Sequence, residues 1–183
     1  MPEYVILVDQ NDQPIGTREK LQTHQDGALH RALSIFVFNS NGQMLLQQRA
    51  YGKYHSGGLW SNTCCTHPRP DESTLEAAHR RLREEMGFDC ELVEIFSFTY
   101  HAELDMNLIE HEYDHVFVGL YEHDPHLNAD EAEAWKWMDV PALQDDLKER
   151  SDVYTPWFKI AFNKITPWLE KPSALANRFD YAA

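Results

Sequence analysis

The chain has 183 residues, of which 43% are hydrophobic and 25% are charged, and it carries a formal net charge of -14 at pH 7. These proportions are typical of a globular protein and argue against wholesale disorder. The acidic balance makes a nucleic-acid partner unlikely, because such binding depends on a basic surface.

Length and targeting features predict one domain in the cytoplasm. A chain of 183 residues fits a single domain with a full core. We place that core at residues 5–170 of the span 1–183 and expect a loosely held tail at residues 171–183. The first apolar run is only strand length and lacks a basic start, so we expect neither a signal peptide nor membrane insertion.

The cysteines indicate a reducing compartment. The chain contains three of them, Cys64, Cys65 and Cys90, which is an odd number. The adjacent pair would form only a strained ring if it were oxidised. A structural disulfide is therefore not expected.

The first 60 residues predict strands and turns. Strands are predicted at residues 4–9, 32–38 and 43–49. A turn-rich return is predicted at residues 10–16, and the Asn-Ser-Asn-Gly sequence at residues 39–42 is a strong hairpin signal between the second and third strands. Residues 51–60 contain three glycines without periodicity, which predicts a loop.

The clearest helix is predicted at residues 74–86. Ser73 with Glu76 makes a capping box, and Gly87 stands where a left-handed cap is wanted. The expected apolar stripe comprises Leu75, Ala78, Leu82 and Met86. Glu85 falls on the shoulder of this stripe, half sheltered, where spacing alone favours an ion pair with Arg81 over a metal ligand.

The remaining elements suggest the fold class. Strands are predicted at residues 92–100, 107–121 and 134–138, and helices at residues 142–149 and 157–169. Mixed strands with one helix in the middle and helices at the end predict an α+β fold, arranged as a three-layer α/β/α sandwich around a mixed sheet.

Two pairs of polar residues share a spacing of two positions, Cys65 with His67 and Glu110 with Glu112. If both stretches are extended, each pair points to one face of its strand. A thiol, an imidazole and two carboxylates then converge on one cavity, where the carboxylates repel each other unless a cation or a proton lies between them. This combination suits a divalent metal beside acid-base groups, although each residue taken singly is more often structural or exposed.

A local basic cluster is also available despite the acidic total. Its candidates are Lys20, Arg49, Lys53, Arg80, Arg81 and Arg83. Such a cluster favours a small phosphorylated substrate. The alternative, which we prefer for at least half of them, is a set of solvated surface charges.

The helix region resembles the Nudix box, in which Glu and Arg residues at fixed spacing precede a Glu pair and a Gly. The matching positions are Glu72, Arg80, Glu84, Glu85 and Gly87. Two positions depart from the box: Thr66 replaces its leading Gly, and Arg81 replaces the Glu that follows its Arg. Nudix hydrolases hold metals with these carboxylates, so the loss of one to a cation puts hydrolysis in doubt.

The departures, the stretch at residues 60–68 and the pair Glu110 and Glu112 resemble the type I isopentenyl diphosphate isomerases. These enzymes have a Nudix fold but are not hydrolases. The resemblance runs from Val5 to Phe158. It implies a Nudix-like sandwich and a 1,3-allylic proton shift that converts isopentenyl diphosphate to dimethylallyl diphosphate in isoprenoid biosynthesis.

The resemblance also implies roles for individual residues. The metal ligands would be His24, His30, His67, Glu110 and Glu112, around Mn²⁺, Mg²⁺ or Zn²⁺. Glu85 would hold a second ion, Mg²⁺, against the diphosphate. The catalytic residues would be Cys65, Glu112, Tyr100 and Trp157. The diphosphate would be bound by Lys20, Arg49, Lys53 and Arg81.

Some assignments rest on the resemblance alone. By themselves, His24 and His30 would be surface histidines, and Trp157 would be a core aromatic as readily as a catalytic one. Alternation along a strand turns Cys64 to the face opposite Cys65. The order in which Cys65 and Glu112 act stays open.

Two other functions remain as alternatives. One is a Nudix hydrolase of a nucleoside or other diphosphate, and the other is a non-catalytic metal-binding or redox-responsive protein. For the isomerase, the expected partner is a prenyl diphosphate, with no nucleic acid and no membrane insertion. The expected assembly is a monomer or a small homo-oligomer.

Overall fold

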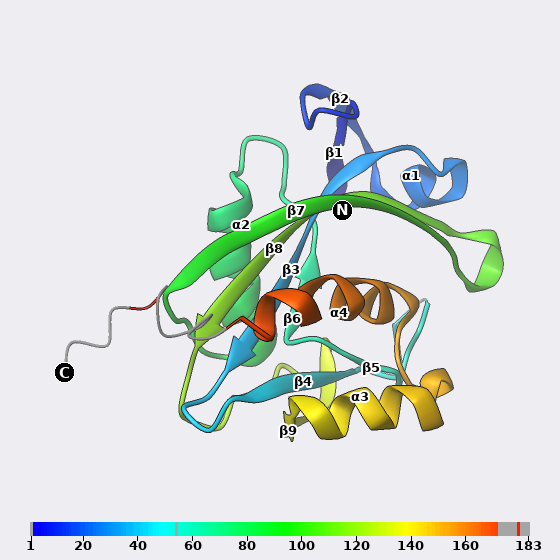
Figure 1. Cartoon of the computed structure of the whole chain (residues 1–183). Coiled ribbons are helices and arrows are strands. Elements are labelled where there is room, and N and C mark those ends of the chain that lie inside the picture. The colour runs from blue at the N-terminus through cyan, green and yellow to red at the C-terminus, as the bar shows by residue number, and fades with distance from the viewer. Residues whose placement is uncertain (1, 54, 172–178, 180–183) are drawn as a thin grey trace.

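The computed structural model describes residues 2–53, 55–171 and 179. Its strands are β1 (Tyr4–Val8), β2 (Pro14–Glu19), β3 (His30–Phe38), β4 (Gln43–Arg49), β5 (Trp60–Ser61), β6 (Cys64–Thr66), β7 (Leu92–Glu103), β8 (Ile109–Leu120) and β9 (Ala132–Asp139). Its helices are α1 (Lys20–Asp26), α2 (Thr74–Arg81), α3 (Val140–Glu149) and α4 (Pro156–Leu169), with a π turn at Leu82–Met86 and 3-10 turns at Asp105–Asn107 and Ser151–Val153. Figure 1 shows α2 and α4 on opposite sides of the strands. None of the described helices is long and apolar enough to cross a membrane.

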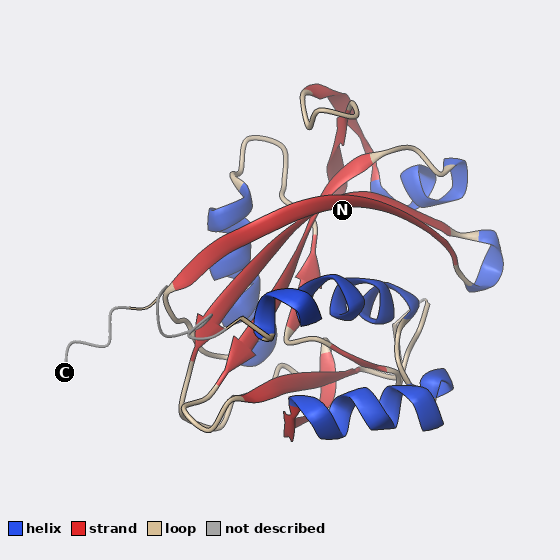
Figure 2. Cartoon of the chain, in the orientation of Figure 1, coloured by secondary structure: helices blue, strands red, loops and turns tan. Residues whose placement is uncertain are grey.

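The three layers meet at β3, the central strand, which is buried on both faces. Phe36 and Phe38 pack in the core beneath α4, whereas Leu33, Ile35 and Val37 pack in the core beneath α2. A strand that is covered on both faces has a continuous apolar sequence, as residues 32–38 do. β8 runs parallel to β3 and β7 runs antiparallel to β8. The predicted α+β sandwich with a mixed sheet is confirmed (Figure 2).

The predicted hairpin at residues 39–42 forms only its turn. Among the described residues, β3 and β4 pair at Phe38 and Met44 alone. β4 then leaves β3 and pairs with β9 and β5, while β6 occupies the position beside β3 at Leu33 to Ile35. Turn chemistry is local, but the course of the strands is decided by their partners. The polar residues described below gather where β3 and β4 separate.

The helix predicted at residues 74–86 is present but changes form along its length. Its capping box is confirmed, since Ser73 and Glu76 exchange hydrogen bonds at 3.0 and 3.2 Å. Leu75 is 42% exposed, so its place in the apolar stripe was wrong: the first turn does not reach the core. The last turn, Leu82–Met86, is a π turn, and Glu85 there is 4% exposed instead of half sheltered. A π turn holds more residues than an α turn, so a wheel of 100° per residue misplaces this carboxylate.

Residues 14–26 contain two elements that the sequence did not predict, β2 and α1. Part of this span was expected to be a turn. Glu19 caps α1 by accepting hydrogen bonds from the Leu21 and Gln22 amides at 3.0 and 2.9 Å. The helix is polar and only 7 residues long, so it has no apolar periodicity to detect.

Other boundaries moved by a few residues. β7 continues to Glu103 where the predicted strand ended at residue 100. Of the tail predicted to be loosely held, the structure describes Lys171 and Phe179, and Phe179 is buried in the core beneath α4. The other tail positions lie outside the described residues.

Gly87 closes the π turn in a conformation that a side chain cannot share. Its φ is 70°, and a Cβ there would lie 2.2 Å from the His126 carbonyl oxygen. We expect Gly87→Ala to lower the free energy of unfolding by about 2 to 4 kcal/mol, because backbone strain adds to a clash with backbone. Urea unfolding measures the loss. Gly42→Ala is the control, since Gly42 has a φ of 75° but open space around it. Equal losses would show that the His126 contact is unimportant.

Candidate active site

One pocket gathers every predicted site residue except His30, which lies beside it in the histidine cluster. Its lining residues are Lys20, His24, Ser34, Arg49, Lys53, His55, Cys65, Thr66, His67, Arg81, Glu85, Tyr100, Glu110, Glu112, Glu131 and Trp157. They come from α1, β3, the end of β4, β6, α2, the π turn, β7, β8 and α4, and from the loops that carry Lys53, His55, His67 and Glu131. The pocket is therefore lined by residues from both β3 and β4, where these two strands separate.

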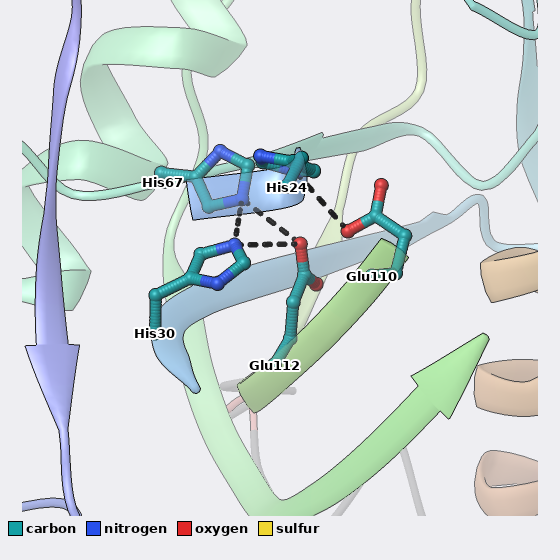
Figure 3. A group of neighbouring side chains, drawn as sticks. All are labelled: His24, His30, His67, Glu110 and Glu112. Atoms are coloured by element: carbon teal, nitrogen blue, oxygen red, sulfur yellow. Dashed lines mark hydrogen bonds and ion pairs between the residues drawn. The ribbon is translucent and has the colours of Figure 1, made fainter. Parts of the chain in front are cut away.

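The three histidines and two glutamates form one compact cluster (Figure 3). Their ligand atoms, from His24, His30, His67, Glu110 and Glu112, all lie within 4.8 Å of one another. His24 and His30 are 1% and 0% exposed, so they are not the surface histidines that their local sequence alone would suggest. α1 carries His24 against β8, and His30 opens β3 beside Glu112.

Hydrogen bonds orient two imidazoles toward the centre of this cluster. Nδ1 of His24 lies 2.7 Å from the Lys20 carbonyl oxygen, and Nδ1 of His30 lies 2.8 Å from that of Ala28. In a neutral imidazole, an Nδ1 that donates leaves Nε2 with a lone pair. Nε2 of His24 then faces Glu110 at 3.5 Å, and Nε2 of His30 faces His67 at 3.1 Å.

Lone pairs that face carboxylates and one another repel unless a cation lies between them. Among the described side chains, Oε2 of Glu110 and Nδ1 of His67 are also buried without a hydrogen-bond partner. A set of three imidazoles and two carboxylates, with an orphaned carboxylate oxygen, fits a divalent cation. The His/Glu cluster therefore has the composition and geometry of a candidate metal site.

Burial, hydrogen bonds and neighbouring charges together shift the pKa values in the cluster. Burial raises the pKa of Glu110, and the charge of Glu112 adds to that shift. Burial alone would raise the pKa of Glu112 as well, but hydrogen bonds from Glu110, His30 and Tyr100 outweigh it and lower the pKa to about 2. Burial and the neighbouring His30 hold the pKa of His67 well below its usual range. A neutral imidazole beside an ionised carboxylate is the form that binds metal.

Glu112 also connects the cluster to the pocket. Its Oε1 lies 2.9 Å from Nε2 of His67, and its Oε2 accepts a hydrogen bond from the Tyr100 hydroxyl at 2.6 Å. Glu112 is opposite Tyr100 in the register of β7 and β8. One carboxylate oxygen is therefore turned to the metal site and the other to a phenol.

The two adjacent cysteines lie on opposite faces of β6, as alternation predicts. Cys65 lines the pocket, whereas Cys64 is buried in the core beneath α2. The Cys65 thiol donates to the Asn62 side-chain oxygen at 2.9 Å, and Ser34 Oγ lies 3.6 Å from the sulfur. Burial raises the pKa of Cys65 well above its usual range, with the charge of Asp114 adding to it.

Trp157 forms one wall of the pocket from the start of α4. Thr155 caps this helix, and Pro156 occupies its first turn. The indole is 5% exposed and donates to Ser61 Oγ at 3.1 Å. His55 packs edge-on against the ring, with centroids 5.6 Å apart, and the Arg49 guanidinium carbon lies 5.1 Å from its centroid.

Four of the six predicted basic residues line the pocket, namely Lys20, Arg49, Lys53 and Arg81. Arg80 instead pairs with Glu72 at 2.6 Å, and Arg83 pairs with Asp89 at the surface. The ion pair predicted between Arg81 and Glu85 is present at 2.6 Å.

Arg81 has three acidic neighbours, since it also bonds Glu84 at 2.9 Å and Glu131 at 3.0 Å. The second oxygen of Glu85 accepts a hydrogen bond from Gln47 at 3.0 Å. Arginines therefore hold the carboxylates at the positions that match the Nudix box, Glu72, Glu84 and Glu85.

Sequence reasoning missed four residues that line the pocket, Ser34, His55, Thr66 and Glu131. Ser34 lies in the apolar run of β3, where a buried hydroxyl is a weak signal that something polar lies nearby. Glu131 contacts both Lys53 and Arg81 from a loop. No spacing rule connects that loop to the helix, so Glu131 gave no signal.

Comparison with known proteins agrees with this geometry. The NUDIX domain family matches residues 28–158. Isopentenyl-diphosphate Delta-isomerase 2 of Aromatoleum aromaticum is 54% identical over 165 residues, covering 90% of this chain and 87% of its own length. The Photorhabdus laumondii protein of the same name is 53% identical over 166 residues, covering 91% of this chain and 94% of its own.

Solved structures agree on the fold. A Deinococcus radiodurans protein superposes with a TM-score of 0.73 at 16% identity, covering 88% of this chain and 98% of its own. The MutT protein of Methanosarcina mazei does so with a TM-score of 0.63 at 20% identity, covering 78% and 96%. At such identities the likeness establishes the fold alone. The closely similar sequences and the NUDIX domain match show that the chain belongs to the type I isopentenyl-diphosphate isomerases of the NUDIX superfamily.

Proposed function

We propose that this protein converts isopentenyl diphosphate to dimethylallyl diphosphate by a 1,3-allylic proton shift. The observation that carries the proposal is the convergence of Cys65, Glu112 and Trp157 on one pocket, which four cationic side chains also line and which adjoins the His/Glu cluster. A proton donor, a proton acceptor, an aromatic face and a diphosphate site are the parts that this reaction needs.

Glu112 and Cys65 exchange the protons with the substrate. An unactivated alkene is a very weak base, so its protonation needs a strong local acid and a stabilised cation. Glu112, with Tyr100 bonded to its Oε2, delivers or relays one proton to the terminal carbon of the alkene. Cys65 takes the other proton from C2, since its sulfur faces the same pocket.

Trp157 stabilises the tertiary cation that develops between the two transfers. A desolvated cation over an indole face gains about 2 kcal/mol. The indole is buried and forms one wall of the pocket, so it helps to exclude water that would trap the cation.

Lys20, Arg49, Lys53 and Arg81 bind the diphosphate, and Glu85 is the proposed ligand of a bridging Mg²⁺. The pocket brings all five together. Glu131, which already bonds Lys53 and Arg81, keeps these two cations near one another.

The His/Glu site is proposed to hold Mn²⁺, Mg²⁺ or Zn²⁺, which when bound polarises the Glu112 carboxyl group. We expect a chelator to abolish turnover and each suitable ion to restore it, with metal content measured alongside activity. His24→Ala should need more added metal, because four ligands remain. His115→Ala is the control, since His115 lies on β8 but pairs with Asp12 and Glu94. Equal metal loss in both variants would contradict the assignment.

The alternatives have less support. In a Nudix hydrolase several box carboxylates hold metals, but here Arg81 replaces one of them and arginines bind Glu72 and Glu84, which leaves Glu85 as the one box carboxylate proposed to bind a metal. In a redox-responsive protein the adjacent thiols would react together, but Cys64 is buried in the core and Cys65 faces the pocket on the other side.

The test of the function is the fate of isopentenyl diphosphate in D₂O. The metal-loaded protein should form deuterated dimethylallyl diphosphate, followed by NMR, and should release no phosphate. Phosphate release from this substrate or from a nucleoside diphosphate, without dimethylallyl product, would restore the hydrolase.

Arg81 should act mainly on substrate binding. We expect Arg81→Gln to raise KM by about ten- to a hundredfold, because a charge-assisted contact with a phosphate is worth about 1.5 to 3 kcal/mol. Arg83→Gln is the matched control, since Arg83 is 57% exposed and pairs with Asp89. Steady-state kinetics of both variants give the answer. Similar KM values in the two variants would place the diphosphate elsewhere.

We further propose a cytoplasmic protein of one domain, active as a monomer or small homo-oligomer. The three cysteines, Cys64, Cys65 and Cys90, are free thiols, which supports a reducing compartment such as the cytoplasm. Gel filtration with light scattering tests the assembly.

A further inference from the structure

Asn62, in the short connection between β5 and β6, uses all the hydrogen-bonding capacity of its side chain. It is 1% exposed. Its Nδ2 donates to the carbonyl oxygens of Ile35 at 3.0 Å and Cys64 at 2.9 Å. These two bonds fix the orientation of the amide, so that Oδ1 accepts from the Cys65 thiol at 2.9 Å and from Ser61 Oγ at 3.1 Å.

Ser61 extends this network to the indole of Trp157. Its Oγ accepts a hydrogen bond from Trp157 Nε1 at 3.1 Å and lies 3.0 Å from Thr155 Oγ1. Asn62 Oδ1 carries no hydrogen, so Ser61 donates to it and Thr155 donates to Ser61. The network therefore has one consistent direction, from α4 through Ser61 to Asn62.

The backbone alone does not fix the positions of the Cys65 thiol and the Trp157 indole. The Cys65 thiol can adopt different staggered rotamers about its Cα–Cβ bond, and the backbone pairing of β6 does not select one. Trp157 belongs to another element, α4, which reaches β5 through the Thr155 amide and the Trp60 carbonyl oxygen at 2.9 Å. A buried network with every partner satisfied holds both groups rigidly.

We propose that Asn62 and Ser61 are positioning residues that hold the Cys65 thiol and the Trp157 indole in one fixed arrangement. The inference rests on the proposed function. Proton transfer at one carbon of a small substrate requires the donor and acceptor atoms to be aligned, and a misplacement of about 1 Å costs about a hundredfold in rate. Neither residue is among those that line the pocket, so both are proposed to act through Cys65 and Trp157, which do line it.

The test compares Asn62→Ala with Thr63→Val. Thr63 is the adjacent residue and is equally buried, but its hydroxyl bonds the Val37 amide at 2.9 Å and the Leu45 carbonyl oxygen at 2.8 Å. The control thus removes two buried hydrogen bonds from the same connection without touching Cys65 or Trp157. The substrate is isopentenyl diphosphate carrying one deuterium at C2, in each of its two configurations.

For Asn62→Ala we expect kcat to fall by about a hundredfold with KM changed by less than about threefold. We also expect this variant to remove either C2 hydrogen, whereas the unmodified protein should remove the same one in every turnover. Thr63→Val should lose stability in urea but keep its kcat and its choice of hydrogen. If Asn62→Ala keeps that choice and matches the kcat of Thr63→Val, the positioning role is wrong.

Ser61→Ala provides a second measurement if Asn62→Ala fails to fold. In a double-mutant cycle with Trp157→Phe, the effect of Ser61→Ala on kcat should shrink, because phenylalanine has no N–H to position. Additive losses would overturn the link to Trp157. A lack of dimethylallyl product from the unmodified protein would instead reject the proposed function, so the two failures are distinguishable.

Discussion

Cys65→Ala should abolish turnover, whereas Cys64→Ala should keep most of it. The two residues are adjacent, but only Cys65 faces the pocket. Removing a positioned proton-transfer group costs about 10²- to 10⁴-fold in rate. The measurement is kcat for dimethylallyl diphosphate formation at saturating metal.

The comparison contains its own control for folding. Cys64→Ala leaves a small void in the core beneath α2 and should lower the free energy of unfolding by about 1 kcal/mol. Cys65→Ala should change stability less and activity far more. Equal losses of activity in the two variants would refute the assignment of faces on β6.

Glu112→Gln should reduce both metal affinity and the chemical step. The amide keeps the shape of the side chain but removes a metal-binding charge and a proton carrier at once. We expect a fall in kcat of about 10³-fold or more that saturating metal does not reverse. Metal content and kcat measured across a metal titration separate the two effects.

Tyr100→Phe is the graded control for this variant. It removes the hydrogen bond to Glu112 Oε2 and leaves the Oε1 contact with His67 in place. A loss of about ten- to a hundredfold is expected, since one hydrogen bond to a charged group is worth about 1.5 to 3 kcal/mol. A near-normal rate for Glu112→Gln at saturating metal would exclude Glu112 as the proton carrier.

The sequence by itself determined the parts of this protein that depend on short-range rules. Alternation along a strand placed Cys65 with the pocket and Cys64 with the core, because successive side chains point to opposite faces whatever the strand pairs with. The same rule brought Glu110 and Glu112 together. The capping box at Ser73 is likewise a matter of local hydrogen bonds, and it was confirmed.

Only the tertiary structure decided which distant segments meet. Burial of His24 depends on α1 packing against β8, and a short polar helix carries no periodic signal of that contact. The burial of Glu85 depends on the π turn and on hydrogen bonds from Arg81 and Gln47 to its carboxylate. A uniform helical wheel cannot represent a π turn. Asn62 bonds Cys65, and Glu131 bonds Arg81, in each case a residue of another element. These contacts exist because β3 and β4 separate after one paired position. The separation is set by strand partners far apart in the chain.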